Sequence, residues 1–297
     1  PSQGGDSGSN PGLATKIPEP DGHSDLPVLS FAPGRLIITP MNTTGNHSIT
    51  RTSAADRIGS FLWQHLLLLA SLYLMTLGVA LCIKSALGSS VISSLPLSLA
   101  RASELGITPR GTVGDYTIMM NGVFVALQIL ILRRGFAPLQ LFQLAVGWVF
   151  GWLIDLNVAI TSPIACQSLW SQAAVQFAGC AVMGVGIALE VRCGSVTMPG
   201  EGITVAISRV SGMPFAKTKI MVDTTLVALA VASSYAFFGF WDWSIVGPGT
   251  LFAMVFIGYE IRLLSPHLGW FDRLLANRPG FRRYIFGLAR FLYPRRH

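Results

Sequence analysis

Charged residues are scarce in this chain. Asp, Glu, Lys and Arg make up 12% of its 297 residues, while hydrophobic residues make up 51%. Soluble domains contain about 25% charged residues, and they rarely contain apolar runs that are as long and as free of charge as those found here. The deficit excludes an ordinary soluble domain and indicates an all-α integral membrane protein.

Basic residues are in excess, but they are not concentrated. The formal net charge is +7, and Lys and Arg occur between the apolar runs and in the C-terminal tail rather than in one patch. We therefore expect no nucleic-acid partner. Basic residues that flank apolar spans are better explained by membrane topology and by contact with anionic lipid.

Motifs for metal binding and catalysis are also missing. The four cysteines form no CxxC or Cys/His spacing, and Cys82, Cys180 and Cys193 lie within or beside apolar runs, as small buried hydrophobic residues do. The Gly-Val-Gly sequence at 184–186 does not join a strand to a helix, as a dinucleotide-binding loop must. We expect no metal, no cofactor and no enzymatic activity.

The first 55 residues differ from the rest of the chain. They are rich in Gly, Ser, Pro, Asn and Asp and show little apolar periodicity. Such a segment buries too little apolar surface to offset the entropy lost on ordering, so we expect a disordered polar arm at 1–55. At the other end, residues 266–297 alternate apolar and basic side chains, which predicts an amphipathic cytoplasmic tail lying on anionic lipid.

An internal duplication divides the membrane part. Two glycine-centred phrases recur at a constant separation of 106 residues, the first at 77–81 and 183–187 and the second at 87–89 and 193–195. Duplication within a hydrophobic chain is typical of transporters with two-fold internal symmetry. We assign the first repeat to residues 56–160 and the second to residues 161–265.

Each repeat contains three apolar runs. The six runs lie at 61–83, 117–132, 138–157, 169–189, 218–238 and 245–264. A run of about 20 residues crosses a bilayer as a helix. Because the number per repeat is odd, the second repeat enters the membrane in the opposite orientation. The sequence therefore predicts about six transmembrane helices, arranged as two inverted three-helix repeats.

The loop charges support this topology. The connectors 158–168 and 239–244 contain no Lys or Arg, whereas Arg133, Arg134 and the arginine-rich tail lie on the other side by the span count. Since cytoplasmic loops carry an excess of basic residues, we expect both termini in the cytoplasm and the chain in a bacterial inner (plasma) membrane. The connector 84–116 is an exception, because it is expected outside yet holds three basic residues.

Two connectors, 86–111 and 194–216, are moderately apolar but interrupted by Gly, Ser and Pro. At membrane depth, irregular backbone must pack inside protein or line a cavity. We interpret each connector as a broken, re-entrant or half-spanning hairpin whose tip lies near the midplane, and such paired segments point to a transport site. The expected tip residues are Pro96, Pro199, Gly200 and Gly202.

Four stretches at these positions also carry a family resemblance, at 77–88, 105–112, 151–155 and 198–202. In their order and spacing they resemble the YczE/YyaS/YitT family of bacterial integral membrane proteins, over about residues 60–265. The resemblance implies a multi-pass inner-membrane transporter or permease of unassigned substrate. About 30 residues follow the membrane part, so the chain is similar to the YczE-like branch, without the soluble C-terminal domain of the YitT branch.

Glu201 is the principal candidate for a functional residue. It lies among Pro199, Gly200 and Gly202 at an expected tip, where partial loss of solvation favours a carboxylate that carries a proton. If the connector lies at the surface, Glu201 is instead a solvated helix cap. The corresponding position of the first repeat is Ser98, so the two halves present unlike chemistry and a single asymmetric acidic site is expected.

Three further polar residues lie in apolar spans. Asp223 could face the same cavity as a proton or cation ligand, or it could pair with Lys219 one turn earlier. Asn121 and Gln128 are candidate hydrogen-bond partners of a substrate, although holding helices together is the commoner role of such residues.

The sequence thus predicts a secondary transporter of a small solute, coupled to protons or cations, with its site between the two broken hairpins. The expected partners are the lipid bilayer and a small-molecule or ion substrate, and a homo-oligomer is compatible with the pattern. Two other classes stay open. A membrane scaffold or accessory protein would present an extensive partner surface, and a membrane-embedded enzyme would bring together at least two reactive side chains.

Overall fold

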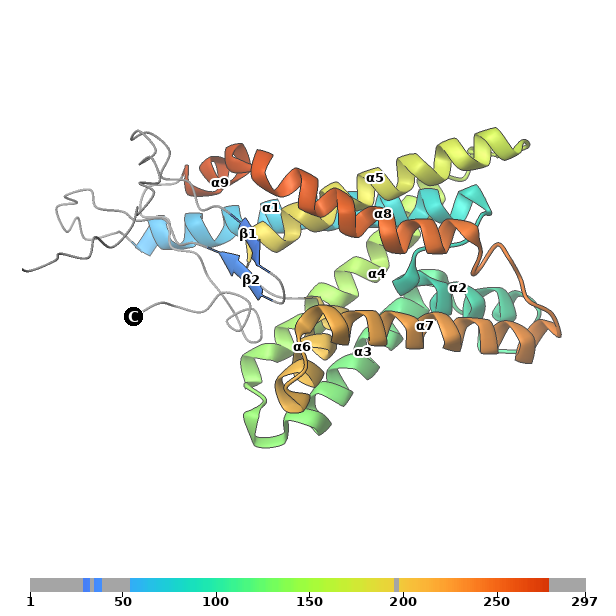
Figure 1. The fold of residues 1–297 in the computed structure, drawn as a ribbon, viewed down its shortest axis with the longest axis horizontal. Coiled ribbons are helices and arrows are strands. Elements are labelled where there is room, and N and C mark those ends of the chain that lie inside the picture. The colour runs from blue at the N-terminus through green and yellow to red at the C-terminus, as the bar shows by residue number, and fades with distance from the viewer. Residues whose placement is uncertain (1–28, 33–34, 39–53, 195–197, 278–297) are drawn as a thin grey trace, which may run out of the picture.

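The computed structural model describes residues 29–32, 35–38, 54–194 and 198–277. The helices, drawn in Figure 1, are α1 (Ala54–Ser85), α2 (Val91–Glu104), α3 (Val113–Leu132), α4 (Phe142–Ile160), α5 (Leu169–Cys193), α6 (Pro199–Ser211), α7 (Phe215–Phe238), α8 (Pro248–Leu264) and α9 (Gly269–Ala276). Single 3-10 turns occur at Arg133–Gly135, Pro138–Leu141 and Ser265–His267. The strands β1 (Leu29–Ala32) and β2 (Arg35–Ile38) pair antiparallel, with Leu29 opposite Ile38.

The membrane class is confirmed. Five helices are long and apolar enough to cross a bilayer, namely α1, α3, α4, α5 and α7. α8 passes the same test together with α9, from which it is bent by 63°, so the described residues provide five or six candidate spans. All six predicted apolar runs are therefore helical. The hairpin of β1 and β2 lies within the arm expected to be disordered, and composition did not predict it; the rest of residues 1–53 lies outside the described residues.

Local sequence signals explain where several helices begin and end. Thr112 and Asp115 form a reciprocal capping box at the start of α3, in which each side chain accepts a hydrogen bond from the other residue's backbone N–H. α5 ends at Gly194, whose left-handed conformation (φ 59°) is the usual helix stop. α6 begins with Pro199, which needs no intrahelical N–H bond at that position.

The two connectors each contain one short helix, α2 with 14 residues and α6 with 13. Within the described residues, irregular backbone flanks α2 at both ends and follows α6, and neither helix is joined to a second short helix inside its connector. Pro199 and Gly200 begin α6, as expected of tip residues. Pro96 does not lie at a tip, because it is the sixth residue of α2 and is buried. The broken character of the connectors was thus predicted, and the position of the break in the first one was wrong.

The backbones of α1 and α5 approach each other closely, and the two helices run in opposite directions (Figure 1). A Cβ added to Gly78 would lie 2.6 Å from the carbonyl oxygen of Gly179 and 2.5 Å from the Cβ of Met183. A Cβ on Gly186 would lie 2.6 Å from the backbone nitrogen of Met75. Neither position leaves room for a side chain, so glycine is required at both.

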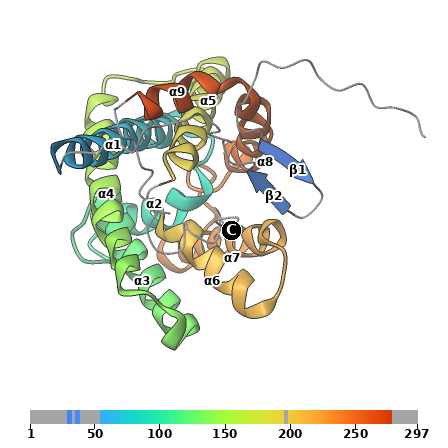
Figure 2. The ribbon, with the colours of Figure 1, turned by 90° about the vertical axis from the view of Figure 1, so that its left-hand side faces the viewer.

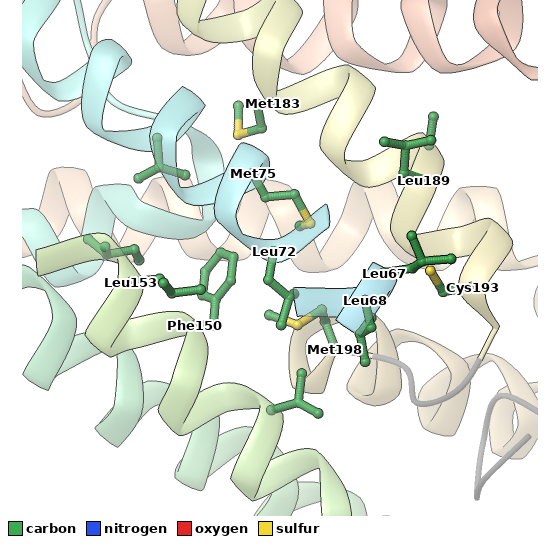
Figure 3. Close-up of a cluster of buried hydrophobic side chains, with 14 of the residues drawn as sticks. Leu67, Leu68, Leu72, Met75, Phe150, Leu153, Met183, Leu189, Cys193 and Met198 are labelled. Atoms are coloured by element: carbon green, nitrogen blue, oxygen red, sulfur yellow. The ribbon is translucent and has the colours of Figure 1, made fainter. Parts of the chain in front are cut away.

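The main hydrophobic core surrounds this helix pair. Figure 3 draws part of it, in which Leu72 and Met75 of α1 lie near Phe150 of α4 and Met183 of α5. The duplicated glycines differ in role, because Gly184, the counterpart of Gly78, packs against the carboxylate of Glu260 on α8. The two copies of the phrase therefore make unlike contacts.

α4 and α8 adjoin α1 and α5, whereas α2, α3, α6 and α7 lie together on one side of that pair (Figures 1 and 2). α4 packs on α1, and α8 packs on α5. α2 packs against α3 and α7, and α6 packs against the same two helices, with α2 towards the right of Figure 1 and α6 towards the left. α3 and α4 also pack closely, whereas the described residues of α7 and α8 make no comparable contact.

We predict that Gly78→Ala destabilises the protein, because the new methyl group overlaps backbone atoms of α5. Overpacking of this kind costs about 1–3 kcal/mol, which a thermal-unfolding scan of purified protein would register as a lower Tm. Gly258→Ala in α8 is the matched control, since a Cβ there has nothing within 4 Å. That change should leave the Tm unchanged or raise it slightly. Equal Tm values for the two variants would contradict the close contact.

Candidate functional site

The first turns of α2 and α6 meet in the interior. A Cβ on Gly200, the second residue of α6, would lie 2.9 Å from the Cδ1 atom of Ile92, the second residue of α2. An apolar cluster encloses the contact and contains Met120, Phe124, Ile203, Val222 and Leu226, with Val91, Ile92 and Leu95 packed against it. The two short helices therefore direct their positive dipole ends towards one region of the interior.

Hydroxyl groups line the start of α2. The Oγ atom of Ser93 lies 2.6 Å from the Oγ atoms of both Ser89 and Ser90, and all three side chains are buried. Further along the same helix, Ser98 accepts a hydrogen bond of 2.7 Å from Ser233 of α7. Ser98 is thus placed between α2 and α7, with its hydroxyl already engaged by protein.

Two glutamine side chains meet at the first turn of α6. A Cβ on Gly202 would lie 2.6 Å from Oε1 of Gln143 and 2.9 Å from Oε1 of Gln128. The amide nitrogen of Gln128 donates to the carbonyl of Pro199 at 3.1 Å. Gln128, from α3, was a sequence candidate; Gln143, from α4, was missed. Gln143 lies four residues before Gly147, which contacts Asn121 of α3. This spacing places both residues on one face of α4 and was the signal in the sequence.

Asn121 lies two turns before Gln128 on α3 and faces α4. Its amide nitrogen donates to the carbonyl of Gly147 at 3.4 Å, and its side chain is 2% exposed. The structure thus brings Asn121, Gln128 and Gln143 to the interface of α3, α4 and α6.

Charged groups gather where α5, α6 and α7 meet. Glu201 is half-buried and interacts electrostatically with Glu190 of α5 and with Lys219 and Asp223 of α7. The Nζ atom of Lys219 lies 2.6 Å from Oδ1 of Asp223, so the ion pair that was one of two alternatives for Asp223 is present. Glu201 and Asp223 therefore belong to one charged cluster, and their functional role stays a prediction.

Glu260 was not among the sequence candidates. Its carboxylate packs over Gly184 of α5, and its Oε2 atom has no hydrogen-bond partner among the described residues. The sequence signal was available, since Glu260 is an acidic residue inside an apolar run.

A buried ion pair holds α9 against α5. Arg192, at the end of α5, donates hydrogen bonds to the carboxylate of Asp272 and to the carbonyl of Ser265. Phe271 and Leu275 on α9 belong to the main core. The first part of the tail therefore packs on protein, while the remainder, from residue 278, lies outside the described residues.

Asp155, near the end of α4, joins that helix to the start of α3. Its carboxylate accepts hydrogen bonds from Thr112 Oγ1 at 2.6 Å and from the backbone N–H of Gly114 at 2.8 Å. A Cβ on Gly114 would overlap both this carboxylate and the carbonyl of Gly151. We refer to these contacts as the Asp155 latch.

At the same end of the protein, Arg101 of α2 pairs with Asp242 in the loop between α7 and α8, at 2.6 Å. Burial alone would raise the pKa of Asp242, but hydrogen bonds from Ser244 and the charge of Arg101 outweigh it, so the pKa lies below its ordinary value. A carboxylate with a lowered pKa stabilises the fold at neutral pH, and this contribution is lost as the pH falls through the folded-state pKa.

We predict that Asp242→Asn lowers the Tm by a few degrees at pH 7, because the neutral amide loses the Arg101 charge interaction. The difference in Tm between wild type and variant should shrink as the pH falls below about 4, where the wild-type carboxylate also becomes protonated. Thermal unfolding across a pH series measures both quantities. A difference that stays constant down to the lowest pH would contradict the role of the charged form.

A shallow groove of about 220 Å³ lies between α1 and α5, away from these polar groups, and is lined by Leu74, Ala181, Val182 and Val185. Its lining is apolar, as expected of a surface that faces lipid.

The fold described above defines a multi-pass membrane protein with two short helices packed among its spans. Comparison with known families assigns it further: the chain belongs to a family of unknown function, DUF6198, which matches residues 62–266. The match covers the helices from most of α1 to the end of α8, and hence every candidate residue named above. No curated protein and no solved structure matches the chain.

Proposed function

We propose that the protein is a secondary transporter of a small solute, built from two inverted repeats, α1–α4 and α5–α8. Its site lies where α2 and α6 meet, and Glu201, with Asp223, couples transport to protons or another cation. The resemblance to the YczE/YyaS/YitT family supports a permease. The placement of Arg133, Arg134 and Lys219 at the opposite ends of the spans from the loops 161–168 and 239–247 supports cytoplasmic termini in a bacterial inner membrane.

The main support for this proposal is that, with one exception, each helix contact in one half has an equivalent contact made by the corresponding helices of the other half. α2 packs on α7 where α6 packs on α3, and α4 packs on α1 where α8 packs on α5. In Figure 1, α1, α3 and α4 each run opposite to α5, α7 and α8, respectively. Two copies of one unit, related by a two-fold axis in the membrane plane, would produce this pattern, which is common among secondary transporters.

Among the described helices, one contact has no comparable counterpart in the other half, namely the contact between α3 and α4. This asymmetry between the halves favours alternating access. α3 and α4 are held together by the Asp155 latch and by Asn121, whereas the equivalent helices α7 and α8 are parted. A transporter of inverted repeats has a second conformation in which the two halves swap their arrangements. In that state α7 would close on α8, and α3 would part from α4.

A second candidate function is a scaffold or accessory protein, and the exposure of α7 is the observation that favours it. The apolar part of α7 is 17% buried, against 44–50% for the other four spans. Ile220, Met221, Leu229 and Tyr235 are among its exposed side chains. In an oligomer or a complex, this face would contact another helix rather than lipid.

Cysteine labelling in liposomes separates the two functions. Ser94 on α2 and Thr204 on α6 are both 0% exposed in this conformation. If the protein alternates between states, Ser94→Cys and Thr204→Cys should each react slowly with a water-soluble maleimide, from opposite sides of the membrane. The background is Cys166→Ser, because the other three native cysteines are buried.

Val79→Cys is the control for this experiment, because Val79 is equally buried but lies in the core around α1 and α5. It should remain unlabelled. Protection of Ser94→Cys and Thr204→Cys to the same degree as Val79→Cys would contradict transport and favour the scaffold.

Glu201→Gln tests the coupling role. The labelling rate of any cysteine rises with pH because the thiolate is the reactive form, so each rate is divided by that of a free thiol at the same pH. Neutralisation of Glu201 should remove the pH dependence that remains for Ser94→Cys after this division, because the charge that interacts with Lys219 and Asp223 is removed, while expression and Tm stay near the parent values. Glu104→Gln, a change at an exposed residue, should keep the parent pH profile. A Glu201→Gln profile identical to that of the parent would remove Glu201 from the coupling mechanism.

A further inference from the structure

Three buried amide oxygens at the interface of α3, α4 and α6 have no hydrogen-bond partner among the described residues. They are Oδ1 of Asn121, Oε1 of Gln128 and Oε1 of Gln143. The three side chains are exposed by only 2%, 0% and 1%, respectively. Buried polar atoms are almost always paired with protein or with a bound species, so three unpaired oxygens in one interface point to a ligand.

The orientation of two of these amides is fixed by the protein. The nitrogen of Gln128 donates to the carbonyl of Pro199, and the nitrogen of Asn121 donates to the carbonyl of Gly147. Each amide therefore uses its donor on the backbone and presents its carbonyl oxygen. The free groups of Gln128 and Asn121 are hydrogen-bond acceptors, which favours a ligand that supplies donors or positive charge.

The backbone of α6 allows two of these oxygens to converge. Because Gly202 has no side chain, Oε1 of Gln143 comes within 2.6 Å of the position that its Cβ would take, and the amide of Gln128 approaches the same position with Nε2 at 2.8 Å and Oε1 at 2.9 Å. A larger residue would displace both amides. Both glutamines are thus directed at the first turn of α6, next to the carboxylate-bearing Glu201 in the chain.

Asn121 lies about 10 Å along α3 from Gln128, so the two oxygens that can share one ligand are those of Gln128 and Gln143. We propose that these two amide oxygens bind a monovalent cation, either an alkali metal ion or the ammonium group of the transported solute. Carbonyl and amide oxygens are the ligands that hard cations prefer, and they accept hydrogen bonds equally well from an ammonium group. The function of the cation, as coupling ion or as part of the substrate, rests on the proposed transport activity. Cation binding itself does not.

The helix dipole of α6 would by itself favour an anion at this position. The unpaired atoms there are acceptors, which repel anions, and Glu201 in the first turn adds a negative charge that offsets the dipole. Lys219, the basic residue nearest to this carboxylate in the charged cluster, already pairs with Asp223. A cation therefore completes the hydrogen bonding at this interface, and an anion does not.

Thermal unfolding of the full-length protein in nanodiscs tests the proposal. NaCl, KCl and methylammonium chloride are compared with N-methylglucamine chloride at constant ionic strength. A saturable rise in Tm of several degrees is expected for at least one of the three small cations. A response to Na⁺ or K⁺ assigns an alkali metal site, and a response to methylammonium alone assigns an ammonium site. No response to any of them overturns the proposal.

Variants locate the response. Gln128→Leu and Gln143→Leu should weaken the apparent cation affinity at least ten-fold. Asn157→Leu is the control, because it removes another buried amide of α4; it should lower the Tm but keep the rise in Tm on addition of the cation. Wild-type affinity in Gln128→Leu would place the cation elsewhere and overturn the assignment. If the leucine variants fail to fold, Gln143→Glu keeps the oxygens and adds a charge, so it should tighten binding several-fold; unchanged affinity would again overturn it.

The outcome is independent of the transport experiment. A cation response with Ser94→Cys and Thr204→Cys fully protected would leave the site intact and remove the transporter. Labelling of both positions without a cation response would support the transporter and remove the cation site.

Discussion

The close approach of the α1 and α5 backbones is the contact on which the rest of the membrane part depends. In a bilayer, apolar side chains gain little by leaving lipid, so helix association relies on van der Waals contact and on interhelical hydrogen bonds. Gly78 and Gly186 allow that contact to be made by backbone atoms. α4 and α8 pack on the outer sides of this pair, and α4 in turn carries Gln143, Gly147 and Asp155 towards α3.

Much of the fold could be predicted from the sequence, because span length and charge depletion are local properties. The six apolar runs became helices, with shifts of a few residues that have identifiable causes. α3 begins at Val113 rather than near 117 because Thr112 and Asp115 cap it. The contacts between helices could not be predicted in this way. The pairing of Arg192 with Asp272 joins residues far apart in the chain, and no local pattern specifies it.

The candidate site likewise combines features that the sequence predicted with contacts that it did not. Glu201, Gln128 and Asn121 stood out as polar groups in apolar surroundings, and the structure places the two amides at the interface of α3, α4 and α6 and Glu201 in the charged cluster with Lys219 and Asp223. Gln143 was missed because one glutamine near a helix start looks the same whether it faces lipid headgroups or a protein interior. Pro96 was misplaced, since a proline marks a missing N–H donor but does not reveal whether the helix continues through it.

The sparse contacts of α7 have a consequence for the energetics of the protein. Its buried residues form a single seam, Thr218, Val222, Leu226, Ala230 and Ser234. Lipid tails are as apolar as leucine side chains, so displacement of this helix breaks the hydrogen bond from Ser233 to Ser98 but otherwise mainly exchanges one apolar neighbour for another. α3 lacks this freedom, because leaving α4 would break the hydrogen bonds of Asp155 and expose the Asn121 amide to hydrocarbon. Moving α7 therefore costs less free energy than moving α3, and we expect bilayer thickness and lipid composition to affect the position of α7 more than that of α3.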